Sequence, residues 1–464
     1  DYPDMTFAPF WEYDSGGADP YHKSAGVGSS NLADAAAFVA DVLAYHNLRY
    51  RDDPELYRLQ GYPVDYLYNS MIYNEPEFWM DVRENMRDTL GYAPIFSLGP
   101  GGLPMTLYAE FEPEYFHRYT DTAFDSIFVF NLWGPTADQF PAKIIDHYRD
   151  DPVQVVGTAV PGYWSVRHNH RTIVHARYTE RLREVLAASL AADVDGIYVT
   201  TWNDYRENTQ FSPSFSYLDS RMEILQTMAA PWLGKSAALE SHMPRAILTY
   251  RKVAYPGEPF DCELLLLPTK GFSGEVSVRL SLRDSQGKLI HKSTLSGTMG
   301  DELTALRLSD TTNPVAIPGP GPDAVSVEVL LVHGGQEYPV SHLPQIAVLP
   351  LDYLDPDLLN YSVPLHKMAS GDKSPGLIIN EEVGPIVPTD GIVSYVLDAP
   401  EDVQFALMRN SRAARMMAPL EMGGAEFYPG RPSTVTLEPR KYPNFVDASS
   451  DQGRRANVPE IQNP

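Results

Sequence analysis

The chain of 464 residues contains a single cysteine, Cys262. One cysteine excludes an internal disulfide framework and any zinc site built from cysteines. Because Cys262 lies in the strand-like stretch Phe260–Leu264, we expect it to be a small buried residue of a strand. The sequence also contains no Gly-x-Ser-x-Gly elbow and no dinucleotide-binding fingerprint. No cofactor is therefore expected.

Basic residues are few, and long apolar runs are absent. The chain has 36 Lys and Arg residues against 61 Asp and Glu residues, a formal net charge of −25. Such a surface repels phosphate backbones, so nucleic acid is not an expected partner. No run of about 18 apolar residues occurs, so no membrane span is expected. Residues 1–4 carry neither a basic region nor an apolar run, so no signal peptide is expected within the sequence.

Residues 1–235 alternate short apolar runs with amphipathic segments. Apolar residues within 32–43 and within 178–186 recur at helical spacing. This alternation predicts βα units around a parallel sheet, in an α/β domain of the (β/α)8-barrel type. The candidate strands are Thr6–Phe10, Val64–Tyr68, Pro94–Leu98, Ser126–Phe130, Val153–Thr158 and Gly196–Thr200.

The number of predicted units is smaller than a closed barrel requires. About six βα units can be counted, whereas a barrel of this type has eight. The first candidate strand also begins almost at the start of the sequence. Two explanations stay open: about two βα units are missing ahead of the first strand, or the fold is a variant barrel.

The pattern of the sequence changes after about residue 240. Residues 276–282 and 325–331 alternate apolar and polar side chains, which is the period of half-buried strands. We predict an immunoglobulin-like β-sandwich over residues 236–350. Residues 351–464 are rich in proline and predict a second small β-domain with a polar tail. Its strand candidates are Ile392–Leu397, Gln404–Met408 and Thr434–Leu437.

The clearest chemical signal follows the last predicted barrel strand. Asp204 and Glu207 stand three residues apart there, where barrel enzymes place their active sites. Cleavage of a glycosidic bond needs two such carboxyl groups. Acids are also favoured at a helix N-terminus, which is the structural alternative. The position directly after a buried strand favours function, and sugar-binding side chains surround the acids: Trp202, Asn203, Tyr205 and Gln210.

The segment also resembles two families of carbohydrate-active enzymes. Trp-Asn-Asp-Tyr-x-Glu over residues 202–207 resembles the acid-bearing motif of glycoside hydrolase family 71, the α-1,3-glucanases. Residues 207–210, followed by Pro213, are similar to a motif of family 99, the endo-α-mannosidases and mannanases. Segments 60–68, 124–127 and 160–163 resemble the fourth, sixth and seventh strands of that family. On this alignment, which covers about residues 1–232, the chain begins near the third barrel strand and lacks the first two βα units.

The resemblance implies that Asp204 and Glu207 are the catalytic pair. In the family 99 scheme the first acid acts on the 2-hydroxyl of the sugar, and the second protonates the leaving group and then serves as base. In family 71 the pair resembles an inverting arrangement. The chain departs from family 99 in having Asp204 in place of Glu, and Arg206 and Asn208 in place of His and Gly. Retention and inversion therefore both stay open.

Further polar and aromatic residues follow the other predicted strands. Residues at these positions line the mouth of a barrel, so we expect them to bind sugar. His168 and His170 suggest a metal site, but no third ligand stands at a recognisable spacing, so no metal is expected. The candidate binding residues are Trp11, Glu12, Asn69, Glu75, Asn131, Trp133 and Tyr163.

Together these features predict a glycoside hydrolase that acts within an α-linked polysaccharide. Mannan-like and α-glucan substrates are equally compatible with the motif. The alternative is a non-catalytic carbohydrate-binding or glycan-assembly protein on a degenerate barrel. The expected partner is a polysaccharide or oligosaccharide, and the expected location is secreted or periplasmic. The sequence makes no prediction of oligomeric state.

Overall fold

The chain divides into two compact units, each described here by itself. Unit 1 comprises residues Asp1–Ala159 and Val185–Thr200, and unit 2 comprises Val160–Glu184 and Thr201–Pro464. The computed structural model describes residues 6–12, 32–68, 76–99, 113–128, 140–164, 172–174, 176–202, 208–213, 216–254, 260–309, 323–340, 343–348, 360–370, 393–397, 405–407, 420–422, 425–427, 433–439 and 446–447.

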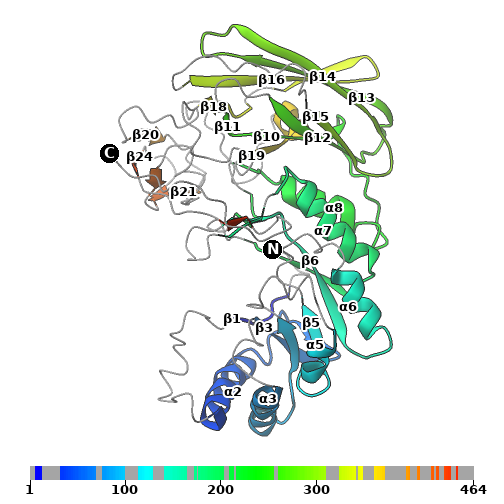
Figure 1. Ribbon diagram of the computed structural model, residues 1–464, viewed down its shortest axis with the longest axis vertical. Coiled ribbons are helices and arrows are strands. Elements are labelled where there is room, and N and C mark those ends of the chain that lie inside the picture. Colours follow the sequence, from blue (N-terminus) through cyan, green and yellow to red (C-terminus); the bar gives the residue numbers. More distant parts are fainter. Residues whose placement is uncertain are drawn as a thin grey trace. The chain divides into compact units, whose positions relative to one another are not determined.

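Unit 1 is built on a parallel sheet whose strands pair in chain order (Figure 1). Each strand is parallel to the next, and the short β2 (Arg58–Leu59) adds antiparallel to β3. This order is that of successive βα units and confirms the predicted α/β domain. The parallel strands are β1 (Phe10–Glu12), β3 (Tyr62–Tyr68), β4 (Ile95–Gly99), β5 (Ser126–Phe128), β6 (Gln154–Ala159) and β9 (Gly196–Val199).

The sheet of unit 1 curls strongly. Neighbouring strands lie about 4.8 Å apart, so the first and last of six strands in a flat sheet would be separated by roughly 24 Å. Yet the ring centroids of Phe10 on β1 and Tyr198 on β9 are 5.8 Å apart. The sheet is therefore a parallel half-barrel. Among the described strands, no backbone pairing joins β1 to β9.

Helices cover the outer face of this sheet because their apolar residues share one side. In α3 the residues Phe78, Val82 and Met86 recur every four positions and are buried. Helix α7 packs closely against β6, since a Cβ at Gly157 would stand 2.7 Å from Ser189. Glycine is required there. The helices are α2 (Leu32–Arg49), α3 (Pro76–Leu90), α5 (Pro113–Thr120), α6 (Phe140–Tyr148) and α7 (Glu180–Ala191).

Unit 2 contains two larger sheets that share one hydrophobic core. The first has the order β15-β12-β10-β19, and the second β11-β18-β16-β13-β14 with β17 beside β16. Side chains of both sheets meet in the core, among them Leu264 and Leu280, and Cys262 is buried there as expected. The strands are β10 (Arg245–Arg251), β11 (Val253–Ala254), β12 (Asp261–Leu267), β13 (Gly274–Arg283), β14 (Leu289–Met299), β15 (Thr304–Ser309), β16 (Asp323–His333), β17 (Gln336–Val340), β18 (Ile346–Val348) and β19 (Asn360–Pro364).

The strands predicted from alternation at residues 276–282 and 325–331 are confirmed by β13 and β16. Strand β19 follows residue 350 but pairs with β10, so this sheet takes a strand from beyond the predicted boundary. The three domain boundaries themselves stay predictions. The remaining elements of unit 2 are β7 (Tyr163–Trp164), β8 (Thr172–Val174), α8 (Ser220–Ala229), α9 (Leu365–Ser370), β20 (Val393–Leu397), β21 (Phe405–Leu407), β22 (Leu420–Met422), β23 (Ala425–Phe427), β24 (Ser433–Pro439) and β25 (Val446–Asp447).

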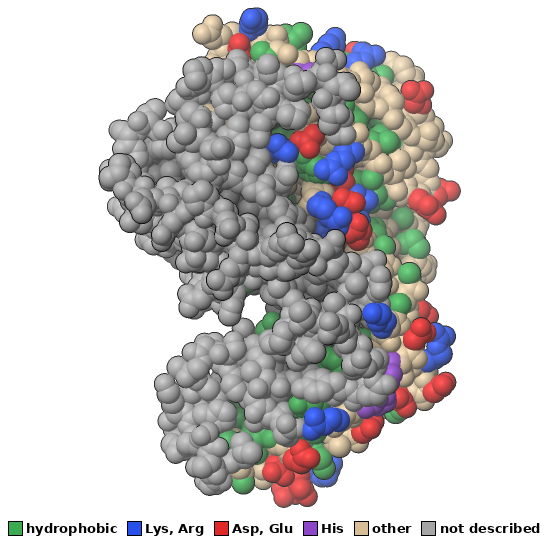
Figure 2. Space-filling view, viewed as in Figure 1, with side chains coloured by type: hydrophobic (Ala, Val, Ile, Leu, Met, Phe, Trp, Pro, Cys, Tyr) green, Lys and Arg blue, Asp and Glu red, His purple; other side chains and the backbone are tan. Residues whose placement is uncertain are grey.

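The described surface mixes charges of both signs. Figure 2 shows Lys and Arg side chains interspersed with Asp and Glu on the face in view. Several form exposed ion pairs, such as Arg279 with Glu337 and Arg283 with Glu328, each at 2.9 Å. Pairs of this kind contribute little to stability because water screens them. In the described part of the chain, no helix has the length and apolar character needed to cross a membrane.

Candidate functional site

Most of the predicted site residues lie outside the described residues. The side chain of Glu12 is also undescribed, although its backbone belongs to β1. Four predicted residues can be placed: Trp11, Tyr163, Trp202 and Gln210. The predicted residues outside the description are Asn69, Glu75, Asn131, Trp133, Asn203, Asp204, Tyr205 and Glu207.

The residues on either side of segment 203–207 are tied to each other. The Thr201 amide donates to the Thr209 carbonyl at 3.1 Å, and the Phe211 amide donates to the Thr201 carbonyl at 2.8 Å. The Ser212 amide donates to the Trp202 carbonyl at 2.8 Å, and the hydroxyls of Thr201 and Thr209 are 2.8 Å apart. The segment that carries the predicted acids thus begins and ends at one hydrogen-bonded neck. Trp202 at this neck is 57% exposed.

Gln210 is fully buried, and among the described residues neither its Oε1 nor its Nε2 has a hydrogen-bond partner. Its backbone carbonyl, by contrast, accepts a hydrogen bond of 2.6 Å from Arg221 Nη1. A buried amide without partners costs about 1–3 kcal/mol, and a bound ligand or water is one way to satisfy it.

Arg221 on α8 fixes the far side of the neck. Its Nη1 also donates to the Asn208 carbonyl at 3.1 Å, and its guanidinium lies 3.7 Å from the ring centroid of Tyr217. The Tyr217 hydroxyl donates to Asn208 Oδ1 at 3.1 Å. These contacts hold Asn208 in the left-handed region, with φ of 57°, which asparagine tolerates better than most residues. Burial lowers the pKa of Arg221 to about 10, so the group is charged at neutral pH.

A second buried cation lies beside the same tyrosine. Lys252 is 3% exposed, donates to the Ser216 hydroxyl, and places Nζ 5.6 Å from the ring centroid of Tyr217. Burial, and secondarily the charge of Arg221, lowers the pKa of Lys252 to about 7. Among the described residues, neither Arg221 nor Lys252 has a carboxylate within ion-pair distance.

A pocket adjoins Arg221. One wall combines Arg221 with Asn208, and the remainder is largely apolar. Gly162 is necessary there, since its φ is 141° and a Cβ would stand 2.9 Å from the Val174 carbonyl oxygen. Tyr163, a predicted sugar-binding residue, lines this pocket together with Asn208 of the neck. Its lining residues are Pro161, Gly162, Tyr163, Val174, Ala176, Asn208 and Arg221.

Trp11 lies on the outer face of the unit 1 sheet and contacts α2. Its ring packs edge-on against His46 at 4.9 Å, and its Nε1 lies 3.4 Å from Asp65 Oδ1. Burial raises the pKa of Asp65 to about 6, although hydrogen bonds from Asn47 and Trp11 oppose the rise. The described contacts of Trp11 are therefore structural, and its sugar-binding role stays a prediction.

The inner face of the half-barrel is aromatic, which the sequence analysis did not predict. Phe128 lies 5.3 Å from Tyr66 and 5.4 Å from Tyr198, measured between ring centroids. Phe10 lies 5.9 Å from Tyr68 on the same face. A Cβ at Gly99 would meet the Phe128 ring at 2.4 Å, so glycine leaves room for this ring. The signal was the spacing of Tyr66 and Tyr68, two residues apart on one strand.

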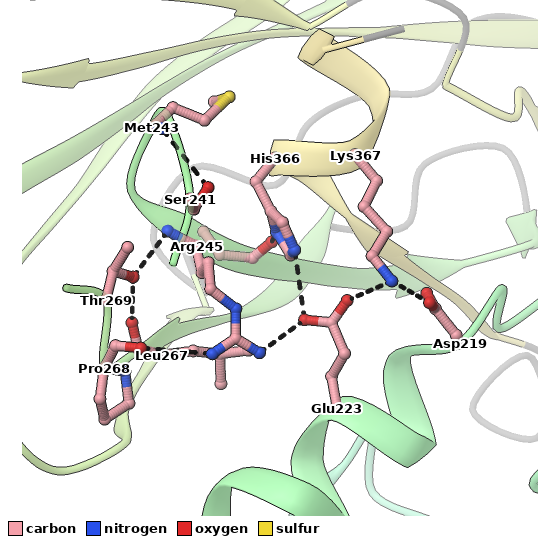
Figure 3. Close-up of polar contacts among 11 residues, drawn as sticks. Asp219, Glu223, Ser241, Met243, Arg245, Leu267, Pro268, Thr269, His366 and Lys367 are labelled. Carbon is pink, nitrogen blue, oxygen red and sulfur yellow. Dashed lines mark hydrogen bonds and ion pairs between the residues drawn. The ribbon is translucent and has the colours of Figure 1, made fainter. Parts of the chain in front are cut away.

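Figure 3 shows a charge cluster around Glu223 of α8. In this cluster, unlike around Arg221 in the described part of the chain, a carboxylate lies beside the basic side chains. Glu223 Oε2 is 3.0 Å from Arg245 and 3.2 Å from His366, and Oε1 is 2.9 Å from Lys367. Lys367 also pairs with Asp219. Burial would raise the pKa of Glu223, but the hydrogen bond and charge of His366, with Lys367, outweigh it and lower the pKa to about 2. We call these five residues the Glu223 cluster. In the described ranges, no group of three His, Cys, Asp or Glu side chains could hold a metal ion.

The comparisons with known proteins yield only distant structural neighbours. The chain matches no family model and no curated protein sequence. The GH99 endo-α-mannosidase of Bacteroides thetaiotaomicron is 18% identical over 45% of this chain and 69% of its own, with a TM-score of 0.34. A glycoside hydrolase-like protein is 16% identical over 42% of this chain and 61% of its own, also at 0.34. The β-glucuronidase of Bacteroides uniformis is 10% identical over 68% of this chain and 37% of its own, again at 0.34.

The chain spans less than two thirds of the second and third of these proteins. At a TM-score of 0.34, none of the three carries an assignment of activity to this chain.

Proposed function

We propose that this chain is a glycoside hydrolase that cleaves an α-linked polysaccharide internally. Asp204 and Glu207 are the catalytic pair, one serving as acid and the other acting on water or on the sugar. The substrate is a mannan-like or α-glucan polymer, met outside the cell or in the periplasm. In the same proposal the half-barrel belongs to a (β/α)8-type barrel, and the two sheets of unit 2 form an immunoglobulin-like sandwich.

One observation carries the proposal. The acid-bearing segment follows β9, the last strand of a curled parallel sheet, and its two ends meet in a hydrogen-bonded neck. Catalytic residues of barrel enzymes stand on loops after such strands. Beside this neck lie an exposed tryptophan, a buried amide without partners and a pocket that includes Tyr163. Aromatic rings and free amides are the groups that proteins use to bind sugars.

The test compares Asp204→Asn and Glu207→Gln with the matched control Glu240→Gln, whose side chain is 81% exposed. We expect each catalytic variant to lower kcat on α-mannan or α-1,3-glucan by about 100-fold or more, as loss of a general acid or base does. Polysaccharide affinity should survive, because each substitution nearly preserves shape. The control should retain wild-type kcat.

Wild-type kcat in either catalytic variant would sink the assignment. Binding without cleavage by the wild-type chain would instead favour the alternative, a non-catalytic carbohydrate-binding protein.

A further inference from the structure

Arg221 and Lys252 are two buried basic side chains, and no buried carboxylate pairs with either of them among the described residues. Arg221 is 6% exposed and Lys252 is 3% exposed. Both face the ring of Tyr217, with Arg221 Cζ at 3.7 Å and Lys252 Nζ at 5.6 Å from its centroid. In the described chain neither reaches a carboxylate. Buried charges are ordinarily paired, because desolvation of an isolated charge is costly.

Helix α8 also contains a buried charge that is paired. Two residues along α8, Glu223 is matched by three basic side chains within 3.2 Å. Within the described part of unit 2, the lack of a carboxylate beside Arg221 is thus a local feature. Positive charge of this kind attracts an anion from solution.

The hydrogen-bond geometry leaves Arg221 able to accept such a ligand. The two hydrogen bonds that it donates to backbone carbonyls, those of Asn208 and Gln210, both leave from Nη1, and the guanidinium also contacts the Tyr217 side chain. Its Nε and Nη2 are not used by these bonds, and the residue lines the pocket with Tyr163. A guanidinium donates two parallel hydrogen bonds to a carboxylate, sulfate or phosphate group.

The geometry points to a binding site for a small oxyanion in this pocket, held by Arg221 with Lys252 supplying the second positive charge. The pocket walls next to the guanidinium are apolar, from Pro161, Val174 and the Tyr163 ring. A sugar that bears one anionic group presents the same combination, an apolar ring face beside an oxyanion. The identification of that anion as a charged substituent on the mannan-like or α-glucan polymer rests on the proposed function.

Lys252 makes the site sensitive to pH. Its pKa of about 7 reflects burial first and the charge of Arg221 second. A bound anion favours the charged form of the lysine and raises this pKa, so binding takes up a proton near neutral pH. Affinity should fall as pH rises from about 7 to 9.

The experiment is isothermal titration calorimetry of the full chain with glucuronate, inorganic sulfate, inorganic phosphate and neutral glucose. We expect an oxyanion to bind at least tenfold more tightly than glucose. Tighter glucuronate binding identifies a carboxylate ligand, whereas tighter sulfate or phosphate binding identifies an esterified one. Arg221→Gln should weaken binding at least tenfold, and Lys252→Met should weaken it several-fold and remove the pH dependence.

Arg283→Gln and Lys288→Met are matched surface controls and should bind as wild type does. Circular dichroism of each variant checks folding, and the pH dependence of Lys252→Met remains informative if Arg221→Gln fails to fold. The inference would be overturned if the wild type showed no preference for an oxyanion over glucose. It would also be overturned if Arg221→Gln and Lys252→Met both bound the oxyanion as tightly as the wild type. If the wild type and Asp204→Asn both bind the oxyanion but the wild type cleaves no polysaccharide, the proposed function is wrong and the oxyanion site stands.

Discussion

Helix α8 carries two buried charge clusters that differ in how their charge is balanced. The Glu223 cluster joins one carboxylate to Arg245, His366 and Lys367 at 3.0, 3.2 and 2.9 Å. Two residues earlier, Arg221 shares the Tyr217 ring with Lys252, and no described carboxylate reaches either cation. The first cluster ties α8 to β10 and α9, which is a structural role. The second leaves charge available beside a pocket, which is typical of a site that binds a ligand.

The largest effect on stability is expected from breaking the balanced cluster. Glu223→Gln leaves Arg245, His366 and Lys367 without their shared carboxylate in a site where Glu223 is 6% exposed. Removing one partner of a buried ion pair costs about 3–5 kcal/mol, so we expect a loss of that order in the free energy of unfolding. Urea unfolding followed by circular dichroism measures it.

Glu328→Gln is the matched control, because its ion pair with Arg283 is exposed. This variant should stay within about 1 kcal/mol of the wild type. A similar loss in both variants would show that burial does not distinguish the two pairs.

A smaller effect, dependent on pH, is expected from the unbalanced pair. Burial lowers the pKa of Lys252 to about 7, below the usual value of 10.5 that it has in an unfolded chain. The unfolded state therefore holds more protons between these values, and the free energy of unfolding of the wild type gains from this group as pH rises from about 7 to 10. Lys252→Met should lack this gain, on the order of a few kcal/mol.

The measurement is the difference in unfolding free energy between wild type and Lys252→Met at pH 6.5 and pH 9.5. Lys288→Met, at an exposed position, is the control for loss of a lysine. The methionine variant should be relatively more stable at the lower pH. A difference that does not change with pH would mean that Lys252 is solvated or paired.

The smallest effect is expected at Gln210. Since neither polar atom of its buried amide has a partner, Gln210→Met removes a desolvation cost and should stabilise the chain by about 1 kcal/mol. The same variant should raise KM if the amide binds a sugar hydroxyl, and kcat should change less. Differential scanning calorimetry with steady-state kinetics measures both. A loss of stability above about 2 kcal/mol would indicate that the amide is satisfied in the folded chain.

Sequence patterns predicted most strands of unit 1 because apolar runs report burial directly, but β1 begins at Phe10, where the predicted strand Thr6–Phe10 ends. The runs at residues 64–68 and 196–200 became β3 and β9 within two residues at either end. Pairing between distant segments was not predictable in this way. Strand β19 joins β10 across more than a hundred residues, and no local pattern in residues 360–364 indicates that partner.

The sequence selected candidate residues that follow strand ends and missed residues that depend on charge balance. Tyr163 was selected for its position, and the structure places it in the pocket beside Asn208, while its sugar-binding role stays a prediction. Arg221 was not, because the sequence Asp219-Ser220-Arg221 is typical of the solvated start of a helix. Whether a cation has a carboxylate partner depends on residues far away in the sequence, which only the fold brings together.

We propose that the acids of the segment from Trp202 to Gln210 cleave a polysaccharide. The most direct measurement incubates the full chain with α-mannan and α-1,3-glucan and follows new reducing ends, with anomeric proton NMR of the first products. We expect new reducing ends from at least one of the two polymers, accompanied by a rapid fall in polymer size that indicates internal cleavage. No new reducing ends from either polymer, under conditions where the chain binds them, would contradict it.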